Sequence, residues 1–250
     1  MKKILLLISL VCAFTAANAQ QGGHVSPAAT EWYTPQPPKV QPGDKPGNPP
    51  SDAIVLFDGK DLSKWVTPKD GKFTDPTWKI EDGAMVIVPG GGDVQTKEYF
   101  GDCQLHIEFK TPKAGPKNTL QMKGNSGIFL QSIYEVQVLD GEDNPTYVNG
   151  MVGSVYKQQA PLANAFTGTE KWQVYDIYYK APRFTTDGAL ESPAMVTVVL
   201  NGILVQNNYI LKGNTPYIGF PTYKAHGRLP LLLQDHGVAV AYRNIWIRNL

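Results

Sequence analysis

The sequence predicts an all-β protein, either a sandwich of two antiparallel sheets or a jelly roll. From residue 52 onward, short segments rich in strand-forming residues recur, several of them with alternating apolar and polar positions. Turn-forming dipeptides separate these segments, and the 250 residues include 24 glycines and 20 prolines. No window sustains the 3.6-residue period of an amphipathic helix beyond one turn. Many short strands with such turns are typical of sandwiches and jelly rolls.

The first 19 residues have the three parts of a secretory signal peptide. Two lysines precede an apolar run over residues 4–14, and Ala-Asn-Ala at 17–19 is a small-residue cleavage site. The apolar run is too short to cross a membrane. The sequence therefore predicts a protein exported to the periplasm or the cell exterior, with no transmembrane segment in a mature chain that begins at Gln20.

Residues 20–51 are predicted to form a proline-rich leader. Eight prolines lie between positions 27 and 50. At that density the backbone cannot keep regular hydrogen bonding, so an extended, semi-rigid segment is expected. Residues 52–250 show no internal repeat and are predicted to form one domain.

The clearest strand signal lies at residues 103–110, where apolar and polar residues alternate strictly. The alternation predicts that four side chains point into the core: Cys103, Leu105, Ile107 and Phe109. Cys103 is the only cysteine after the predicted signal peptide. We therefore expect no internal disulfide and interpret Cys103 as a small buried apolar side chain.

Two strand-like runs follow at residues 127–131 and 134–139. In the second run the valines point to one face, while Glu135 and Gln137 point to the other. A strand inside a closed core should not carry polar residues on a row, so this pattern predicts one solvent-facing side.

The strands in the last third of the chain are predicted from strand-forming residues and from a turn-forming dipeptide. Residues 172–181 are rich in aromatic and β-branched residues, which strands prefer. Asn201-Gly202 predicts a tight hairpin within residues 195–208. Residues 240–250 are expected to form the closing strand.

The formal net charge of +1 gives no electrostatic reason to expect nucleic acid or an anionic membrane as a partner.

Several segments of this domain are the basis of a family resemblance. The most specific are Asn125-Ser126-Gly127-Ile128, Tyr134-Glu135-Val136-Gln137 and Leu233-Gln234-Asp235-His236-Gly237. The chain from about residue 52 to 250 resembles the 3-keto-disaccharide hydrolase domain of Bacteroidetes, formerly a domain of unknown function. The resemblance implies a concanavalin A-like jelly roll with a saccharide or glycoside substrate. It also implies exported sugar catabolism, in which sugars oxidised to a ketone at carbon 3 are cleaved.

Glu135 is the candidate general base. Retaining glucanases of the same broad fold need two carboxylates on one strand face, but here positions 135, 137 and 139 carry Glu, Gln and Leu. A 3-keto sugar needs less, because the ketone acidifies the proton on carbon 2. One base can remove that proton, and the group on carbon 1 then leaves before water adds. Gln131 and Gln137 are predicted to orient the site, although Glu135 is alternatively an ordinary solvated surface residue.

His236 is the second catalytic candidate. It shares a strand face with Gln234, which is predicted to bind substrate, and it either transfers protons, binds a metal or caps the strand end. Arg243 alternates with small residues. It either clamps a sugar hydroxyl or the enolate oxygen, or pairs with Glu135.

Aromatic residues supply further candidates for binding a sugar ring. Tyr134 and Tyr156 are predicted to contact substrate, with Lys157 at the rim of the cleft. Trp172, Trp246 and Phe129 are alternatives, although aromatic rings more often pack in the core. Trp246 opposes its neighbours by alternation, so only one of the two rows is expected to be buried.

No cofactor is predicted, and a divalent metal remains an open alternative. The oxygen-rich turn at Asp140 and Asp143 lacks the fuller spacing of a calcium loop. A metal held by His236 and Glu135 would stabilise an enediolate directly. The alternative function is that of a non-catalytic carbohydrate-binding module, because this fold also serves lectins.

Overall fold

A computed structural model describes residues 25–115 and 118–250. The predicted signal peptide lies outside the described residues. The described chain divides into two units, with the boundary between residues 39 and 40, and the larger unit comprises residues 40–250. The smaller unit, described from residue 25 onward, contains the short 3-10 helix η1 (Pro27–Thr30). Within the described ranges, no helix has the length and apolar character needed to cross a membrane.

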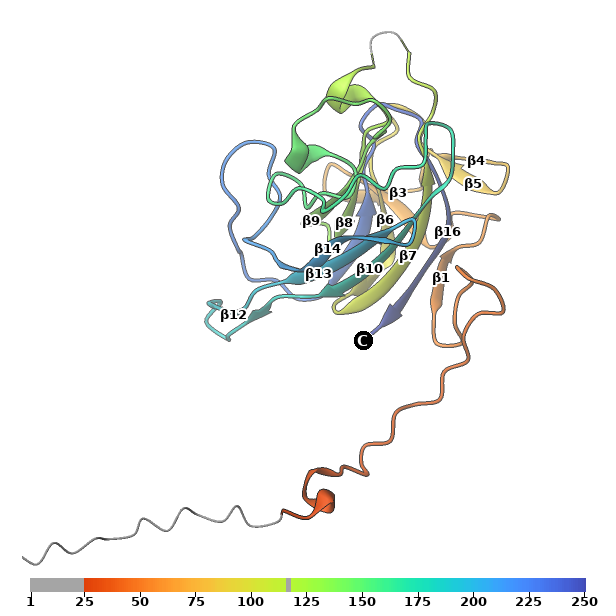
Figure 1. Ribbon diagram of the computed structural model, residues 1–250. Coiled ribbons are helices and arrows are strands. Elements are labelled where there is room, and N and C mark those ends of the chain that lie inside the picture. The colour runs from red at the N-terminus through yellow and green to blue at the C-terminus, as the bar shows by residue number, and fades with distance from the viewer. Residues whose placement is uncertain (1–24, 116–117) are drawn as a thin grey trace, which may run out of the picture. The chain divides into compact units, whose positions relative to one another are not determined.

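The larger unit is a β-sandwich of two main antiparallel sheets (Figure 1). Its eight-stranded sheet runs β14 (Ile203–Ile210), β13 (Met195–Leu200), β10 (Gln173–Lys180), β7 (Cys103–Lys110), β16 (Ala241–Asn249), β5 (Ala84–Val86) and β4 (Lys79–Glu81), with β1 (Ile54–Phe57) paired to β16. Its six-stranded sheet runs β3 (Lys72–Thr74), β2 (Trp65–Lys69), β6 (Val94–Phe100), β15 (Leu229–Leu233), β8 (Ser126–Leu130) and β9 (Tyr134–Val138). A small sheet pairs β11 (Arg183–Phe184) with β12 (Leu190–Ser192), and the 3-10 helices η2 (Leu120–Met122) and η3 (Val148–Gly150) lie in connections. The predicted all-β class is confirmed.

The turn between β13 and β14 shows why the local sequence specifies this hairpin. Asn201 and Gly202 have φ values of 52° and 80°. Both central residues of a type I′ turn need positive φ, which asparagine and glycine tolerate. The predicted hairpin is therefore confirmed.

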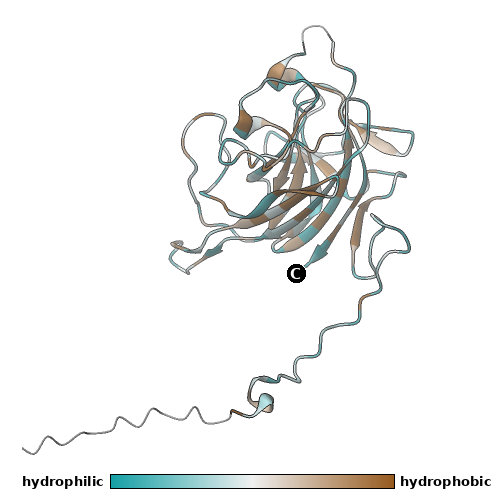
Figure 2. Ribbon diagram, viewed as in Figure 1, coloured by the Kyte–Doolittle hydropathy of each residue, from teal (hydrophilic) through white to brown (hydrophobic). Residues whose placement is uncertain are grey.

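The core lies between the two sheets, and strand alternation decides which side chains enter it. Cys103, Leu105, Ile107 and Phe109 all belong to the buried cluster, as predicted. Figure 2 shows the corresponding alternation of hydrophobic and hydrophilic bands along the strands. Burial raises the pKa of the Cys103 thiol to about 12, so this side chain is an unreactive core residue.

Three tyrosines of the eight-stranded sheet cross the core to the β8–β9 hairpin. Tyr242 donates to the hydroxyl of Ser126 over 2.6 Å, and Tyr175 donates to the carbonyl of Gln137 over 2.8 Å. Tyr179 donates to the Gln131 side chain over 2.8 Å. A buried phenol needs a hydrogen-bond partner, so these contacts hold the hairpin against the opposite sheet.

Residues 40–51, which the sequence assigns to the leader, belong to the larger compact unit. The carbonyl of Gly47 accepts hydrogen bonds from Asn244 Nδ2 and Trp246 Nε1, over 3.0 and 2.9 Å. This segment covers Trp246, which is only 5 % exposed, while Ile245 and Ile247 are also buried. The expectation that only one row of this strand is buried is therefore wrong, because chain from outside the sheet covers the second row.

Candidate functional site

A pocket of about 240 Å³ lies on the side of β8 and β9 that faces away from the core. Strand alternation creates this side, because Val136 and Val138 enter the core while Glu135 and Gln137 point the opposite way. The nine lining residues come from β8, β9 and four connections: Asn125, Phe129, Glu135, Gln137, Tyr156, Thr215, Tyr217, Gln234 and His236. The pocket is large enough for about one sugar ring.

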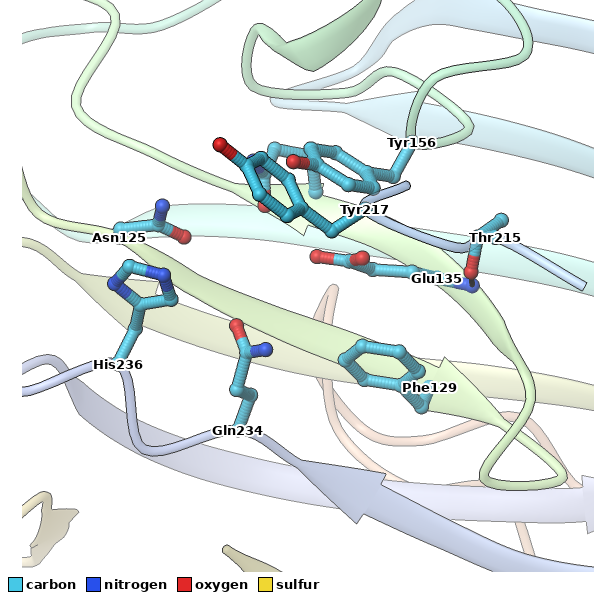
Figure 3. Close-up of a pocket in the computed structure, with 9 residues that line it drawn as sticks. Asn125, Phe129, Glu135, Tyr156, Thr215, Tyr217, Gln234 and His236 are labelled. Carbon is cyan, nitrogen blue, oxygen red and sulfur yellow. Dashed lines mark hydrogen bonds between the residues drawn. The ribbon is translucent and has the colours of Figure 1, made fainter. Parts of the chain in front are cut away.

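Glu135 is the only carboxylate among these lining residues. In Figure 3 its carboxylate lies between two tyrosine rings on one side and Phe129 and Gln234 on the other. The residue is 5 % exposed, so the predicted solvent-facing side is in fact covered by connecting loops. Burial raises the pKa of Glu135 from 4.5 to about 8, and no hydrogen bond or described cation opposes that shift. A carboxyl group with this pKa can exchange a proton near neutral pH.

Two connections hold the backbone of Glu135 in place, because β9 lies at the edge of its sheet. The amide of Glu135 donates to Thr215 Oγ1 over 3.0 Å, and that hydroxyl donates to the carbonyl of Ile133 over 3.1 Å. The amide of Tyr156 donates to the carbonyl of Glu135 over 3.1 Å. Two residues of the pocket wall therefore fix the candidate base through its main chain.

Gly127 makes room for the carboxylate from the neighbouring strand. A Cβ atom at this position would lie 2.6 Å from Glu135 Oε1 and 2.6 Å from the ring of Phe129. Residue 127 pairs with Gln137 across the β8–β9 ladder. The glycine is therefore required by the close approach of the two side chains.

Amide groups form one wall of the pocket. Gln137 Nε2 donates to Gln121 Oε1 over 3.2 Å and to the carbonyl of Gly150 over 3.3 Å. Its Oε1 atom is buried and has no hydrogen-bond partner among the described residues. Asn125 donates to the carbonyl of Gln121 over 2.6 Å. Such an unpaired buried acceptor is costly unless a ligand supplies a donor.

Gln234 and His236 approach the carboxylate from the segment after β15 (Figure 3). The main-chain amide of Gln234 donates to the carbonyl of Gly127 over 3.0 Å, and the main-chain carbonyl of Gln234 accepts from Ser126 Oγ over 2.6 Å. Neither side chain forms a hydrogen bond with another described residue, so both remain available to a ligand. Asp235 between them points elsewhere and accepts from the amides of Gly92 and Gly237, which stabilises the turn.

Tyr156 reaches the pocket as a neutral hydroxyl. Its oxygen lies 2.8 Å from the hydroxyl of Tyr147, and its pKa is raised by burial and by that hydrogen bond. Lys157 does not line the pocket. Its Nζ donates to the carbonyl of Tyr217 over 2.9 Å and lies 4.5 Å from the centre of that ring. Lys157 therefore holds Tyr217 in the pocket wall. It was predicted to lie at the rim of the cleft, and it contributes to the pocket only through Tyr217.

Five of the predicted site residues meet in this pocket: Glu135, Gln137, Tyr156, Gln234 and His236. Gln131 does not, because it lies in the β8–β9 turn with φ 51° and its amide donates to the carbonyls of Phe100 and Gly227. Tyr134 also does not, because its ring is in the core and its hydroxyl contacts His226 over 2.8 Å. The prediction that Gln131 and Tyr134 lie beside Glu135 in the site is therefore wrong.

Arg243 lies in the other sheet. Its Nε atom donates to Glu108 Oε2 over 2.6 Å, and its guanidinium carbon lies 4.0 Å from the centre of the Trp172 ring. The expected contact with Glu135 or with a sugar beside it is therefore wrong. Alternation correctly groups Arg243 with Ala239 and Ala241, but alternation does not say which sheet the group belongs to.

Thr215 and Tyr217 are pocket residues that sequence reasoning missed. They belong to the connection between β14 and β15, which has no strand periodicity and several glycines and prolines. Asn125 was within a recognised motif but had no assigned role, and Phe129 was named as an alternative aromatic contact for a sugar ring. A loop residue reaches a site through the path of the chain, which local patterns do not encode.

The oxygen-rich turn at Asp140 is occupied by protein contacts. The buried Asp140 carboxylate lies 3.1 Å from Lys123 Nζ and accepts from Thr111 Oγ1 over 3.0 Å. It also accepts from the amide of Glu142 over 3.0 Å. Across residues 25–115 and 118–250, no three His, Cys, Asp or Glu side chains group as metal ligands would. The ion pair with Lys123 makes Asp140 an anchor for the surrounding loops.

Known proteins match both the sequence and the fold. A model of the 3-keto-alpha-glucoside-1,2-lyase-like domain matches residues 52–248. The crystal structure of a candidate glycosyl hydrolase from Parabacteroides distasonis is similar with 48% identity and a TM-score of 0.83, covering 91% of this chain and 98% of that one. A second candidate glycosyl hydrolase from that organism has 21% identity and a TM-score of 0.60, covering 80% and 94%, and supports the fold alone. No curated protein matches the chain significantly.

The sandwich, the enclosed pocket and these similarities define a carbohydrate-active class of protein. The chain belongs to the family of 3-keto-alpha-glucoside-1,2-lyase-like domains, the family that its motifs indicate.

Proposed function

We propose that this protein cleaves the glycosidic bond of 3-keto-glucosides, including 3-keto-disaccharides, by elimination followed by hydration. The observation that supports this reaction best is the single buried carboxylate, Glu135, in a pocket otherwise lined by amides, hydroxyls, aromatic rings and an imidazole. A two-carboxylate glycosidase mechanism lacks its second acid among the lining residues. Elimination beside a ketone needs only one strong base.

The proposed reaction begins when ionised Glu135 takes the proton from carbon 2. The electron pair of that bond moves toward the ketone and forms an enolate at carbon 3. The enolate then expels the oxygen on carbon 1, and the departing group takes up a proton. Water finally adds across the new double bond, giving a hydroxyl on carbon 1 and a proton on carbon 2.

The surrounding donors suit the two oxygens that gain charge. Tyr156 carries its proton through the working pH range, because its pKa is raised, so its hydroxyl can donate to an enolate oxygen. Gln234 can donate in the same way from the other side of Glu135. His236 is exposed at the pocket edge, where it can protonate the departing group or orient the water. The unpaired Oε1 of Gln137 can accept a sugar hydroxyl.

Export is part of the proposal and rests on the signal-peptide pattern of the first 19 residues. A periplasmic or extracellular location would place the enzyme where glycosides from outside the cell first become available. Detection of a chain beginning at Gln20 in a periplasmic or secreted fraction would support it.

The ketone should be essential for turnover. We expect the protein to release glucose from 3-keto-trehalose and to leave unoxidised trehalose intact, because only the ketone acidifies the proton on carbon 2. Product is followed by chromatography, with the Glu135→Gln variant as the matched control. Equal cleavage of both sugars would contradict the elimination route, and binding without turnover would indicate a carbohydrate-binding module.

The pH dependence should report the ionisation of Glu135. Because the pKa of Glu135 is about 8 and the base must be ionised, kcat/KM should rise about tenfold per pH unit below that value and level off above it. Initial rates on 3-keto-trehalose between pH 5.5 and 9.5 would measure this profile, where the pH limits bracket the pKa by roughly two units. A rate that falls above pH 8 would instead make Glu135 the proton donor and would contradict its assignment as base.

A further inference from the structure

A second cavity, of about 470 Å³, lies on the eight-stranded sheet, on the side that faces away from the core. Tyr242 of β16 enters the core, whereas its neighbours Ala241 and Arg243 line this cavity. Glu135 projects from the other sheet, so the two sites lie on opposite outer faces of the sandwich. The lining is Glu81, Asp82, Ala84, Val86, Lys110, Thr111, Pro112, Glu170, Trp172, Ala239, Ala241 and Arg243.

The floor of this cavity is small and apolar. Ala241 pairs with Val86 of β5 on one side and with Lys110 of β7 on the other. Ala239 lies two residues before Ala241 and lines the same cavity. Short side chains in this row leave a trough between longer residues on either side. Such a floor can contact the C–H face of a sugar ring.

One wall is a fixed stack of Trp172 and two cations. Lys110 Nζ lies 5.0 Å and the Arg243 guanidinium carbon 4.0 Å from the centre of the Trp172 ring. Both contacts are within the range of cation–π interactions. The stack limits the movement of Arg243 and presents its guanidinium at the cavity.

Glu108 holds the same guanidinium from behind. Its Oε2 accepts from Arg243 Nε over 2.6 Å, and its Oε1 accepts from Asn244 Nδ2 over 2.9 Å. The two Nη groups of Arg243 make no hydrogen bond with another described residue. They are therefore oriented donors that do not need to be ordered again when a ligand binds.

Carboxylates at the cavity offer acceptors. Glu81 ends β4 and Asp82 lies in the turn that follows, across β16 and β7 from Trp172, whereas Glu170 precedes β10 on the Trp172 side. With Lys110 and Arg243, the lining has two cations and three carboxylates, so neither an anion nor a cation is strongly favoured. Donors and acceptors around an apolar floor match the hydroxyl rim and C–H faces of a neutral sugar.

We propose that this cavity is a second saccharide site, which binds neutral glucosides without cleaving them. Only the choice of glucose as the sugar rests on the proposed function; saccharide binding at this place rests on the cavity itself. A non-catalytic site on the face opposite Glu135 would retain a glucoside-bearing substrate near the enzyme and raise its local concentration.

The test is NMR of the tryptophan indole groups during titration with unoxidised trehalose. The Trp172 indole signal is identified by its loss in Trp172→Phe, and it should shift saturably at millimolar trehalose. Arg243→Gln removes the oriented donors, and Ala239→Leu fills the trough. Each should weaken binding at least about tenfold, as expected for charge-assisted hydrogen bonds or lost space.

Two controls separate this site from the first pocket and from unfolding. Arg248→Gln changes another arginine of β16, outside the cavity, and should leave the trehalose affinity unchanged. Tyr217→Ala alters only the first pocket and should also leave the Trp172 shift unchanged. Weakening by either cavity variant, with the other indole signals in place, supports the proposal. The proposal is overturned if the wild type shows no saturable Trp172 shift, or if both cavity variants bind trehalose as tightly as the wild type. Either outcome holds whatever the enzyme does to 3-keto sugars.

Discussion

Glu135→Gln should reduce kcat/KM on 3-keto-trehalose at least about 10³-fold at pH 8, because the amide keeps the shape of the side chain but cannot remove a proton. The residue is 5 % exposed and forms no side-chain hydrogen bond with the described residues, so the substitution breaks no structural contact. Activity and substrate affinity are measured together. We expect KM to change much less than kcat, because the loss concerns the transition state.

The same variant should fold more stably than the wild type at alkaline pH. The pKa of Glu135 is 4.5 ordinarily and about 8 when buried, so between these values the unfolded chain loses the proton while the folded protein keeps it. Stability of the wild type therefore falls as the pH rises through this window, and above it the buried charge costs on the order of 5 kcal/mol. Chemical unfolding at pH 5 and pH 9 would show this difference. A variant that is inactive and also less stable at pH 9 would point to a structural role for Glu135.

The hairpin that carries Glu135 could be predicted because all its signals are local. Alternation places Val136 in the core and Glu135 on the opposite side, and the observed β9 follows that pattern. Alternation says nothing of what covers the outer side. Thr215 and Tyr217 come from a distant connection, and they turn a polar sheet face into an enclosed pocket with a raised carboxyl pKa.

Arg243 and Trp246 of β16 also show that alternation does not specify which segments cover a strand. The alternation of Arg243 with alanines is a real surface feature, but it belongs to the eight-stranded sheet and to another cavity. Trp246 is buried because the segment around Gly47 lies over it, although that segment has the composition of a linker. In both cases the deciding contact joins residues far apart in sequence, which a local pattern cannot specify.

Gly127→Ala should lower kcat/KM about 10²-fold without removing any functional group. The new Cβ atom would lie 2.6 Å from Glu135 Oε1, so the carboxylate must move, and a displacement of about 1 Å can cost that much in rate. The overpacked contact should also cost about 1–3 kcal/mol of stability. Kinetics on 3-keto-trehalose and chemical unfolding at the same pH would measure the two effects.

Gly101→Ala is the matched control for this substitution. A Cβ atom there would be in ordinary contact, 3.7 Å from the side chain of Arg228, and Gly101 does not line the pocket. It should retain wild-type activity. Because the ring of Phe129 is also 2.6 Å from the new Cβ atom at position 127, Phe129→Leu is combined with Gly127→Ala to relieve that contact alone. If the double variant regains the activity of Phe129→Leu, the ring and not the carboxylate was displaced. If its kcat/KM stays about 10²-fold below that of Phe129→Leu, the close approach of residue 127 to Glu135 positions the base.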